Sequence, residues 1–122
     1  MPAGAPAPAA AASSMVAMSV PVSLAELPAQ IERFGSNPYL VTVGADAAPR
    51  ATSVRVQWQG RVLMTGAGTR TAENIRENDK IVLLWPAPSP GEHALIVDGW
   101  AEVHGGAVLI QPAKAVLHVT RH

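Results

Sequence analysis

Cysteine is absent from this 122-residue chain, which excludes disulfide bonds and thiolate metal ligands. Because disulfides mark oxidising compartments, the absence favours a cytoplasmic protein. An excess of charge is absent as well, since nine Lys and Arg residues balance nine Asp and Glu residues. The chain therefore has no net attraction for nucleic acid or an anionic membrane, and an anion site has to come from local placement of arginines.

Long apolar runs are also missing, and no stretch approaches the ~20 apolar residues that a membrane-spanning helix needs. Residues 1–20 are rich in Ala, Pro and Ser, and the first charge of the chain is Glu26. The segment resembles a secretory signal in composition, but it lacks a basic start and its early prolines break an apolar helix. We therefore predict a disordered tail over residues 1–20 and one folded domain over residues 21–122.

One amphipathic helix is expected near the start of this domain. Ser23 and Glu26 have the spacing of a capping box. Apolar residues follow at helical intervals up to Gly35, which is a suitable end. Pro28 cannot donate an interior helix bond, so we expect a first turn followed by a helix that restarts at Pro28.

Beyond Pro38 the apolar residues recur with the period of two that is typical of strands. A hairpin turn is predicted at Gln59-Gly60, and Gly99 indicates a bend or bulge inside the longest strand. The run 81–85 is apolar without alternation, as in a strand buried on both faces. The chain is thus predicted to be mostly β (α+β), a small barrel of about six antiparallel strands or more. The expected strands are 39–43, 50–58, 61–65, 81–85, 94–103, 107–110 and 115–119, with a second helix over 69–78.

The segment with the strongest chemical signal joins a strand to this second helix. Gly66 and Gly68 precede Thr69-Arg70-Thr71 at the helix start. A helix N-terminus offers unpaired N–H groups, glycines allow a ligand to approach closely, and hydroxyl and guanidinium groups complete an oxyanion site. Arg50 begins a neighbouring strand and can reach the same phosphate. The alternative is an ordinary connection whose helix is capped by Thr69 or Thr71; such caps are common, and chemistry alone favours this alternative.

Five short segments, taken in order, resemble the pyridoxamine 5′-phosphate oxidase-like family of flavin and deazaflavin oxidoreductases. The resemblance extends from about Ser23 to Val103. Members of this family are split β-barrels that bind flavin mononucleotide (FMN) at a dimer interface. The resemblance therefore implies a split barrel with two short helices, an FMN site and a homodimer. The five segments are 50–55, 62–65, 68–75, 82–86 and 97–101.

The resemblance also implies roles for particular residues. Arg50, Thr69 and Arg70 correspond to a cage for the cofactor phosphate. Arg55 falls where family members place a basic residue nearer the substrate, and in a regular strand it would point away from Arg50. No catalytic residue is assigned, because a flavin performs the hydride chemistry itself. Thr52, Ser53 and Val54 correspond to contacts with the flavin ring, and Met64 and Thr65 to the strand end beside it. The full set of implied cofactor contacts is Arg50, Thr52, Ser53, Val54, Met64, Thr65, Thr69, Arg70 and Thr71.

Three positions depart from the family pattern. Thr71 stands where a basic residue often follows the cage arginine, and Ala94 stands where the vitamin B6 oxidases have a polar flavin contact. The C-terminal segment that grips the substrate in those oxidases has no counterpart before His122. We therefore expect a flavin-dependent oxidoreductase that does not oxidise pyridoxamine phosphate.

Two other functions remain open. The same barrel can use the deazaflavin coenzyme F-420, although its long anionic tail would favour more basic residues than Thr71 leaves. A barrel of this kind can also be a non-enzymatic carrier of flavin or haem.

Two further constellations are weak. Ser53, His93 and Asp98 are a nominal hydrolase triad, but no nucleophile elbow surrounds Ser53. The four histidines show no metal-ligand spacing, so no metal site is predicted.

Overall fold

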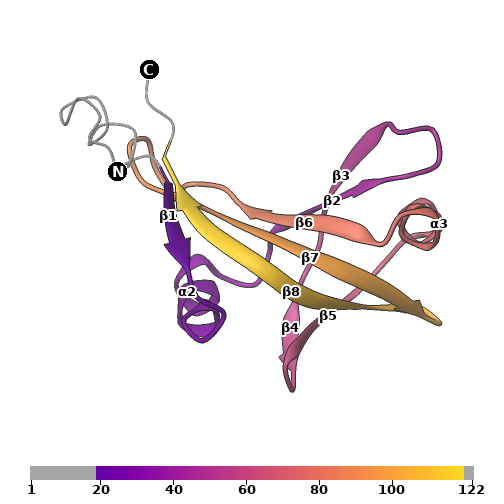
Figure 1. Cartoon of the computed structure of the whole chain (residues 1–122), viewed down its shortest axis with the longest axis horizontal. Helices are drawn as coiled ribbons and strands as arrows, with labels where there is room; N and C mark the ends of the chain where they lie inside the picture. The colour runs from indigo at the N-terminus through magenta and orange to yellow at the C-terminus, as the bar shows by residue number, and fades with distance from the viewer. Residues whose placement is uncertain (1–18, 120–122) are drawn as a thin grey trace, which may run out of the picture.

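The computed structural model describes residues 19–119; residues 1–18, which hold most of the predicted tail, and 120–122 lie outside the described part. Ser19 and Val20, assigned to the tail from composition, belong to the first strand. Neither described helix is long and apolar enough to cross a membrane. The elements in chain order (Figure 1) are β1 (Ser19–Val22), α2 (Leu27–Phe34), β2 (Tyr39–Val43), β3 (Pro49–Ser53), β4 (Gln57–Gln59), β5 (Val62–Gly66), α3 (Thr69–Glu77), β6 (Lys80–Trp85), β7 (Ala94–His104) and β8 (Ala107–His118).

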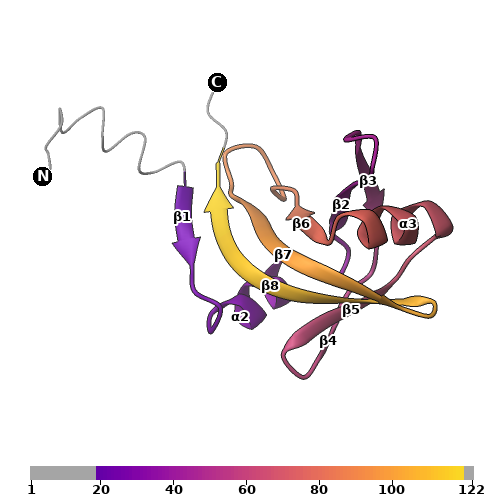
Figure 2. The ribbon, with the colours of Figure 1, turned by 45° about the vertical axis from the view of Figure 1, so that its right-hand side comes forward.

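The strands form one eight-stranded sheet in the order β3-β2-β6-β7-β8-β5-β4, with β1 paired to β8. All of these pairs are antiparallel. The long strands β7 and β8 bend along their length (Figure 2), so the sheet wraps around a core. The end strands β3 and β4 do not pair with each other. The fold is therefore a small antiparallel split barrel, as the sequence predicts.

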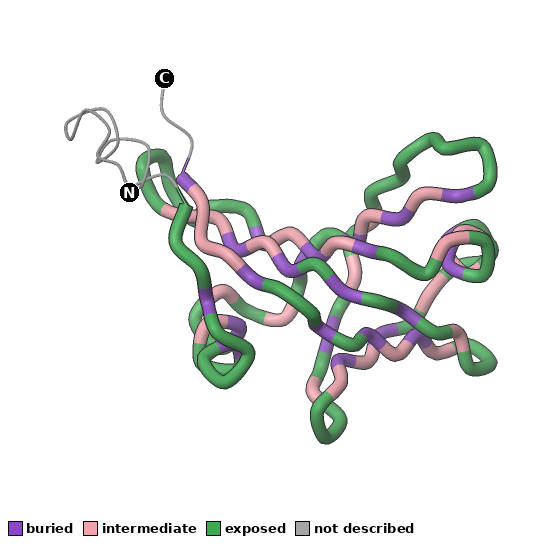
Figure 3. Tube along the Cα trace, in the orientation of Figure 1, coloured by how far each residue is buried: buried purple, intermediate pink, exposed green. Residues whose placement is uncertain are grey.

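The core lies on the concave face of the sheet. Side chains alternate between buried and more exposed along β6, β7 and β8 (Figure 3), because successive residues of a strand point to opposite faces. Helix α2 buries Leu27 and Ile31, and α3 buries Thr71 and Ile75. The indole Nε1–H of Trp85 donates a 2.8 Å hydrogen bond to the carbonyl oxygen of Gly35, which fixes the end of α2 to the sheet.

Strand β6 differs from its prediction. Its apolar run indicates burial on both faces, but only Ile81, Leu83 and Trp85 are buried, while Val82 and Leu84 are half-buried. The described residues therefore cover one face of this strand and leave the other partly open.

The start of α2 matches its prediction. A turn precedes the helix, which runs from Leu27 and has Pro28 in its first turn. The backbone N–H of Ser23 donates to Glu26 Oε1 at 3.0 Å, and the N–H of Glu26 donates to Ser23 Oγ at 3.2 Å. These reciprocal bonds are the predicted capping box. They hold the pKa of Glu26 below its usual value, because the backbone N–H and then the hydroxyl of Ser23 stabilise the carboxylate.

The predicted strand 50–58 is wrong, because it is two strands at opposite ends of the sheet. β3 ends at Ser53 and pairs with β2, whereas β4 begins at Gln57 and pairs with β5. Between β3 and β4, the N–H of Val54 donates to the carbonyl oxygen of Pro38, and the N–H of Val56 donates to that of Ser36. These bonds to the segment before β2 position the chain as it crosses from one end of the sheet to the other. The hairpin after β4 turns at Gly60-Arg61, one residue later than predicted, with Gly60 at φ 64°.

The predicted bulge at Gly99 is confirmed. The pairing of β7 with β8 shifts register between Asp98 and Gly99, and Gly99 lies opposite Pro112. A Cβ on Gly99 would stand 2.5 Å from the carbonyl oxygen of Gln111, so only glycine fits this close approach. The bulge also explains a second difference, since the two strands predicted at the C-terminus are one strand, β8, that accommodates Pro112 at the irregularity.

Candidate functional site

The N-terminus of α3 is open to a ligand. Gly68 is its N-cap residue, and no side chain makes a capping hydrogen bond. The helix cap by Thr69 or Thr71 is therefore wrong, whereas an ordinary connection with solvent-exposed arginines stays an untested alternative. The first turn contains no acidic residue, and Thr69 and Arg70 are exposed. Unpaired N–H groups and the positive end of the helix dipole thus face outward beside a guanidinium and a hydroxyl group.

Gly68 is not explained by the fold of the described residues. Its φ of −73° suits any residue, and a Cβ added to it would meet no atom within 4 Å. Neither backbone strain nor packing requires glycine here. A bound anion close to the N–H groups of the first turn is a reason for a residue without a side chain at this position, so this cradle and its donor set fit a phosphate.

Arg50 lies on the same side of the sheet as α3. It is paired with Thr42 across β2 and β3, and residues directly opposite one another in an antiparallel pair share a face. The Oγ1 of Thr42 accepts a 3.1 Å hydrogen bond from Nδ2 of Asn74 on α3. Arg70 precedes Asn74 by one helical turn. Both ribbon views place α3 beside the end of the sheet where β2 turns into β3 (Figures 1 and 2).

Asn74 is a residue that sequence reasoning missed. Besides its bond to Thr42, its Oδ1 atom would lie only 2.3 Å from a Cβ at Gly44, so the glycine at the end of β2 lets α3 pack closely. Its position was the available sequence signal, because Asn74 is a polar residue three positions after Thr71. The side chain of Thr71 is on the buried face of α3. Asn74 thereby anchors the helix that carries Thr69 and Arg70.

Thr71 occupies a different place from its neighbours in the predicted cage. It is 4% exposed and shares the buried face of α3 with Ile75. Thr69 and Arg70 are exposed.

The predicted ring contacts on β3 divide between the two faces of the sheet. Thr52 is opposite the fully buried Leu40, and Ser53 is opposite the exposed Tyr39. Thr52 therefore faces the side of α3 and Ser53 the outer side. Val54 follows the end of the strand and is half-buried.

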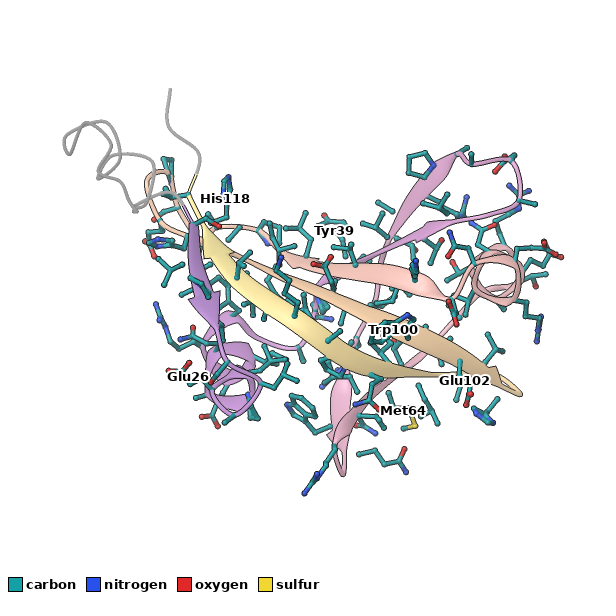
Figure 4. The ribbon with its side chains drawn as sticks, viewed as in Figure 1. Glu26, Tyr39, Met64, Trp100, Glu102 and His118 are labelled. Carbon is teal, nitrogen blue, oxygen red and sulfur yellow. The ribbon has the colours of Figure 1, made fainter. Side chains whose placement is uncertain are left out.

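A groove of about 240 Å³ brings Arg55, Met64 and Thr65 together. Met64 projects from β5 (Figure 4), where it is opposite Gln57 and Leu109. Arg55 lies in the non-strand segment between β3 and β4, so the parity argument that set it against Arg50 does not apply. Sequence reasoning missed the other residues that line this groove, which are Val56, Gln57, Gly66, Gly106 and Ala107. The last two belong to the β7–β8 turn region, which is brought to the groove by the long-range pairing of β5 with β8.

The weaker constellations form no site. No hydrogen bond among residues 19–119 joins Ser53, His93 and Asp98. Within the same range no group of His, Asp and Glu is arranged to hold a metal ion. The imidazole of His104 lies 2.6 Å from Glu102 on an exposed hairpin, which is a surface pair.

Known structures share this arrangement of elements, although no protein-family model and no curated protein matches the sequence. A proposed pyridoxamine 5′-phosphate oxidase from Listeria innocua is 21% identical with a TM-score of 0.61, over 77% of this chain and 96% of its own. An FAD-binding protein from Mycobacterium smegmatis is 15% identical with a TM-score of 0.58, over 84% and 99%. An F-420 reductase is 17% identical with a TM-score of 0.55, over 66% and 88%. The chain therefore has the split-barrel fold of pyridoxamine 5′-phosphate oxidase-like proteins.

Proposed function

We propose that this protein binds FMN and is a flavin-dependent oxidoreductase. The observation that carries the proposal is the uncapped N-terminus of α3, with Gly68 free of packing constraints and Arg50 on the same side of the sheet. The fold supports it, because proteins with an oxidase, an F-420 reductase and an FAD-binding description share this barrel.

The roles of the residues in this proposal are those that the family resemblance implies, adjusted where the structure differs. The first-turn N–H groups of α3, Thr69 and Arg70 bind the phosphate from one side, and Arg50 binds it from β3. Thr71 contributes through packing, since its side chain is buried. Thr52, Ser53, Val54, Met64 and Thr65 flank the flavin ring. When bound, the flavin supplies hydride and electron transfer, and the protein supplies position and electrostatics.

Arg55 marks the substrate side. Its guanidinium is exposed, and among residues 19–119 it is the only charged group lining the groove beside Met64 and Thr65. It offers a positive contact for an anionic or electron-rich substrate near the ring. Because Ala94 stands where the vitamin B6 oxidases have a polar flavin contact, we propose a substrate other than pyridoxamine phosphate.

We further propose that a second copy of the chain covers the outer face of the sheet and completes the site. Cross-strand pairing places Tyr39, Leu84, Ile96 and Val116 in one apolar row on that face. Leu84, Ile96 and Val116 are half-buried, and Tyr39 is 44% exposed. We call these four residues the outer row. Ser53 projects beside this row, so a partner seated there would reach the ring contacts.

Two other uses of the same site compete with FMN. The similarity to an F-420 reductase favours coenzyme F-420 as the cofactor. The similarity to an FAD-binding protein favours a non-enzymatic flavin carrier. The absorption spectrum of the purified protein, with mass identification of the released cofactor, separates FMN from F-420, because FMN absorbs well to the red. Reduction of the bound cofactor by a nicotinamide donor, followed by turnover, separates an enzyme from a carrier.

Titration of the apoprotein with FMN and riboflavin tests the phosphate site. A charge-assisted contact to phosphate contributes about 1.5–3 kcal/mol, so Arg50→Ala and Arg70→Ala should each weaken FMN binding by roughly ten- to a hundredfold. Riboflavin has no phosphate, and its affinity should hardly change. Arg76→Ala, an exposed substitution in the last turn of α3, is the matched control, and Arg55→Ala should leave FMN affinity nearly unchanged.

Gly68→Asp gives a second test in which two readouts move in opposite directions. An aspartate at the N-cap can bond the free N–H groups of α3, so the melting temperature should stay equal or rise. The same carboxylate would repel and displace a phosphate, so FMN should bind at least tenfold more weakly while riboflavin is little affected. Equal losses for both flavins in the arginine and Gly68 variants would show that the phosphate binds elsewhere.

A further inference from the structure

A second groove, larger than the one beside Arg55, lies between the start of α2 and the β4–β5 hairpin. Its volume is about 690 Å³, within the range of small-molecule sites. Leu24 and Pro28 form the side of the helix, Trp58 and Arg61 the side of the hairpin, and Gln111 and Pro112 the side of β8. None of these residues is among those assigned to FMN. We call this cavity the helix–hairpin groove.

The walls of the helix–hairpin groove are mainly apolar and flat. Leu24 is 49% exposed although it is a large aliphatic residue, and the ring of Trp58 and the two prolines present planar surfaces. Leu24, the two prolines and Trp58 line the same groove, and a shared apolar surface of this kind indicates a binding site where a single exposed leucine would not. The groove therefore suits a flat, apolar body.

Charge in the groove has one sign. Arg61 is exposed and is the only charged residue that the described part of the chain contributes to the lining. No carboxylate among residues 19–119 forms an ion pair with it, because the single pair found there joins His104 and Glu102. Two other grooves differ, since one combines Arg33 with Glu92 and another Lys80 with Asp98, whereas the groove beside Arg55 shares the single positive charge.

Trp58 adds a polar group that lacks a partner. Its Nε1–H is buried and makes no hydrogen bond in the structure. A buried unpaired donor is unfavourable, and most such donors in proteins have a partner. Trp58 is opposite Leu63 of the hairpin, is itself half-buried and lines the groove, so a ligand bound there is a candidate source of the missing acceptor.

We propose that the helix–hairpin groove is a second binding site, separate from the FMN site, for a flat apolar organic acid whose carboxylate pairs with Arg61. The aromatic or alicyclic body lies against Leu24, Trp58 and the prolines, and the carboxylate also accepts the Trp58 N–H. Charge complementarity selects the acid over a neutral molecule of the same shape, because none of the described residues that line the groove is acidic.

Titration of the ¹⁵N-labelled full-length chain with 2-naphthoate tests this site, with 2-naphthalenemethanol as the neutral ligand of the same shape. The indole N–H signal of Trp58, identified by its loss in Trp58→Phe, should shift with naphthoate, while those of Trp85 and Trp100 stay in place. Naphthoate should bind about three- to tenfold more tightly than the alcohol. Arg61→Gln should abolish that preference, and Arg76→Gln should retain it.

Three results would overturn the proposal. One is the absence of naphthoate binding at millimolar concentration. This result would also be obtained if another segment of the chain occupied the groove. Another is an equal affinity for acid and alcohol in the unaltered protein. The third is displacement of naphthoate by FMN, which would make the groove part of the flavin site. Failure of FMN to bind at all leaves this experiment unaffected, so the two proposals stand or fall separately.

Discussion

At the scale of single residues, Gly99 and Gly68 are glycines for two different reasons. Gly99 is required by packing, since a Cβ there would lie 2.5 Å from a backbone oxygen of the adjacent strand. Gly68 has open space around its Cβ position, and we propose that a bound phosphate is the reason for a glycine there. The first glycine therefore reports on the fold and the second on the proposed function.

Gly99→Ala should destabilise the protein. The methyl group meets the carbonyl oxygen of Gln111, and moving a paired backbone at the β7–β8 bulge costs about 1–3 kcal/mol, the usual range for overpacking. Thermal and urea unfolding would measure the change. Gly106→Ala is the control, because a Cβ there meets nothing within 4 Å, and its stability should match the parent. Equal stabilities for all three proteins would contradict a steric requirement for glycine at the bulge.

The capping box before α2 stabilises an element rather than a site. Ser23→Ala removes two of its bonds to Glu26 and should slightly lower the free energy of unfolding, because these exposed bonds close the turn that leads into α2. The backbone bond to the carboxylate remains, so the helix itself should persist in circular dichroism spectra. Chemical denaturation at neutral pH would measure the loss.

This contribution should depend on pH in a defined direction. The pKa of Glu26 is lowered below 4.5 in the folded protein by its bonds to Ser23. A carboxylate with a lowered folded pKa stabilises the protein above its unfolded pKa, and the contribution disappears as the pH falls through the folded pKa. The stability difference between the parent and Ser23→Ala should therefore shrink below pH 4.5. A difference that stays constant into acid would assign the effect to the hydroxyl alone.

At the scale of the whole molecule, the outer row is expected to be the contact between two copies. Tyr39→Glu places a charge on that row at a position already 44% exposed, so the subunit should fold while the dimer dissociates. Leu24→Glu is the matched control, because Leu24 is 49% exposed but lies away from the row. Light scattering coupled to size-exclusion chromatography should give a dimer for the parent and the control and a monomer for Tyr39→Glu. A parent protein that is monomeric at micromolar concentration would contradict this arrangement.

The local pattern of the chain was enough to predict most elements. The helix after Ser23, the hairpin near Gly60, the helix after Gly68 and the bulge at Gly99 all follow from capping, turn and periodicity rules that act over a few residues. The order of segments around Arg50 and Arg70 further implied the split barrel, which the structure and its neighbours confirm.

Only the tertiary structure decided how these elements combine. The break after Ser53 depends on hydrogen bonds from Val54 and Val56 to the segment before β2, which no local pattern reveals. The contact of Asn74 with Thr42 joins residues 32 positions apart, and it places α3 on the side of the sheet that Arg50 faces. Short-range sequence rules determine what each segment becomes, but strand order is set by long-range pairing, and that pairing decides which side chains meet in a site.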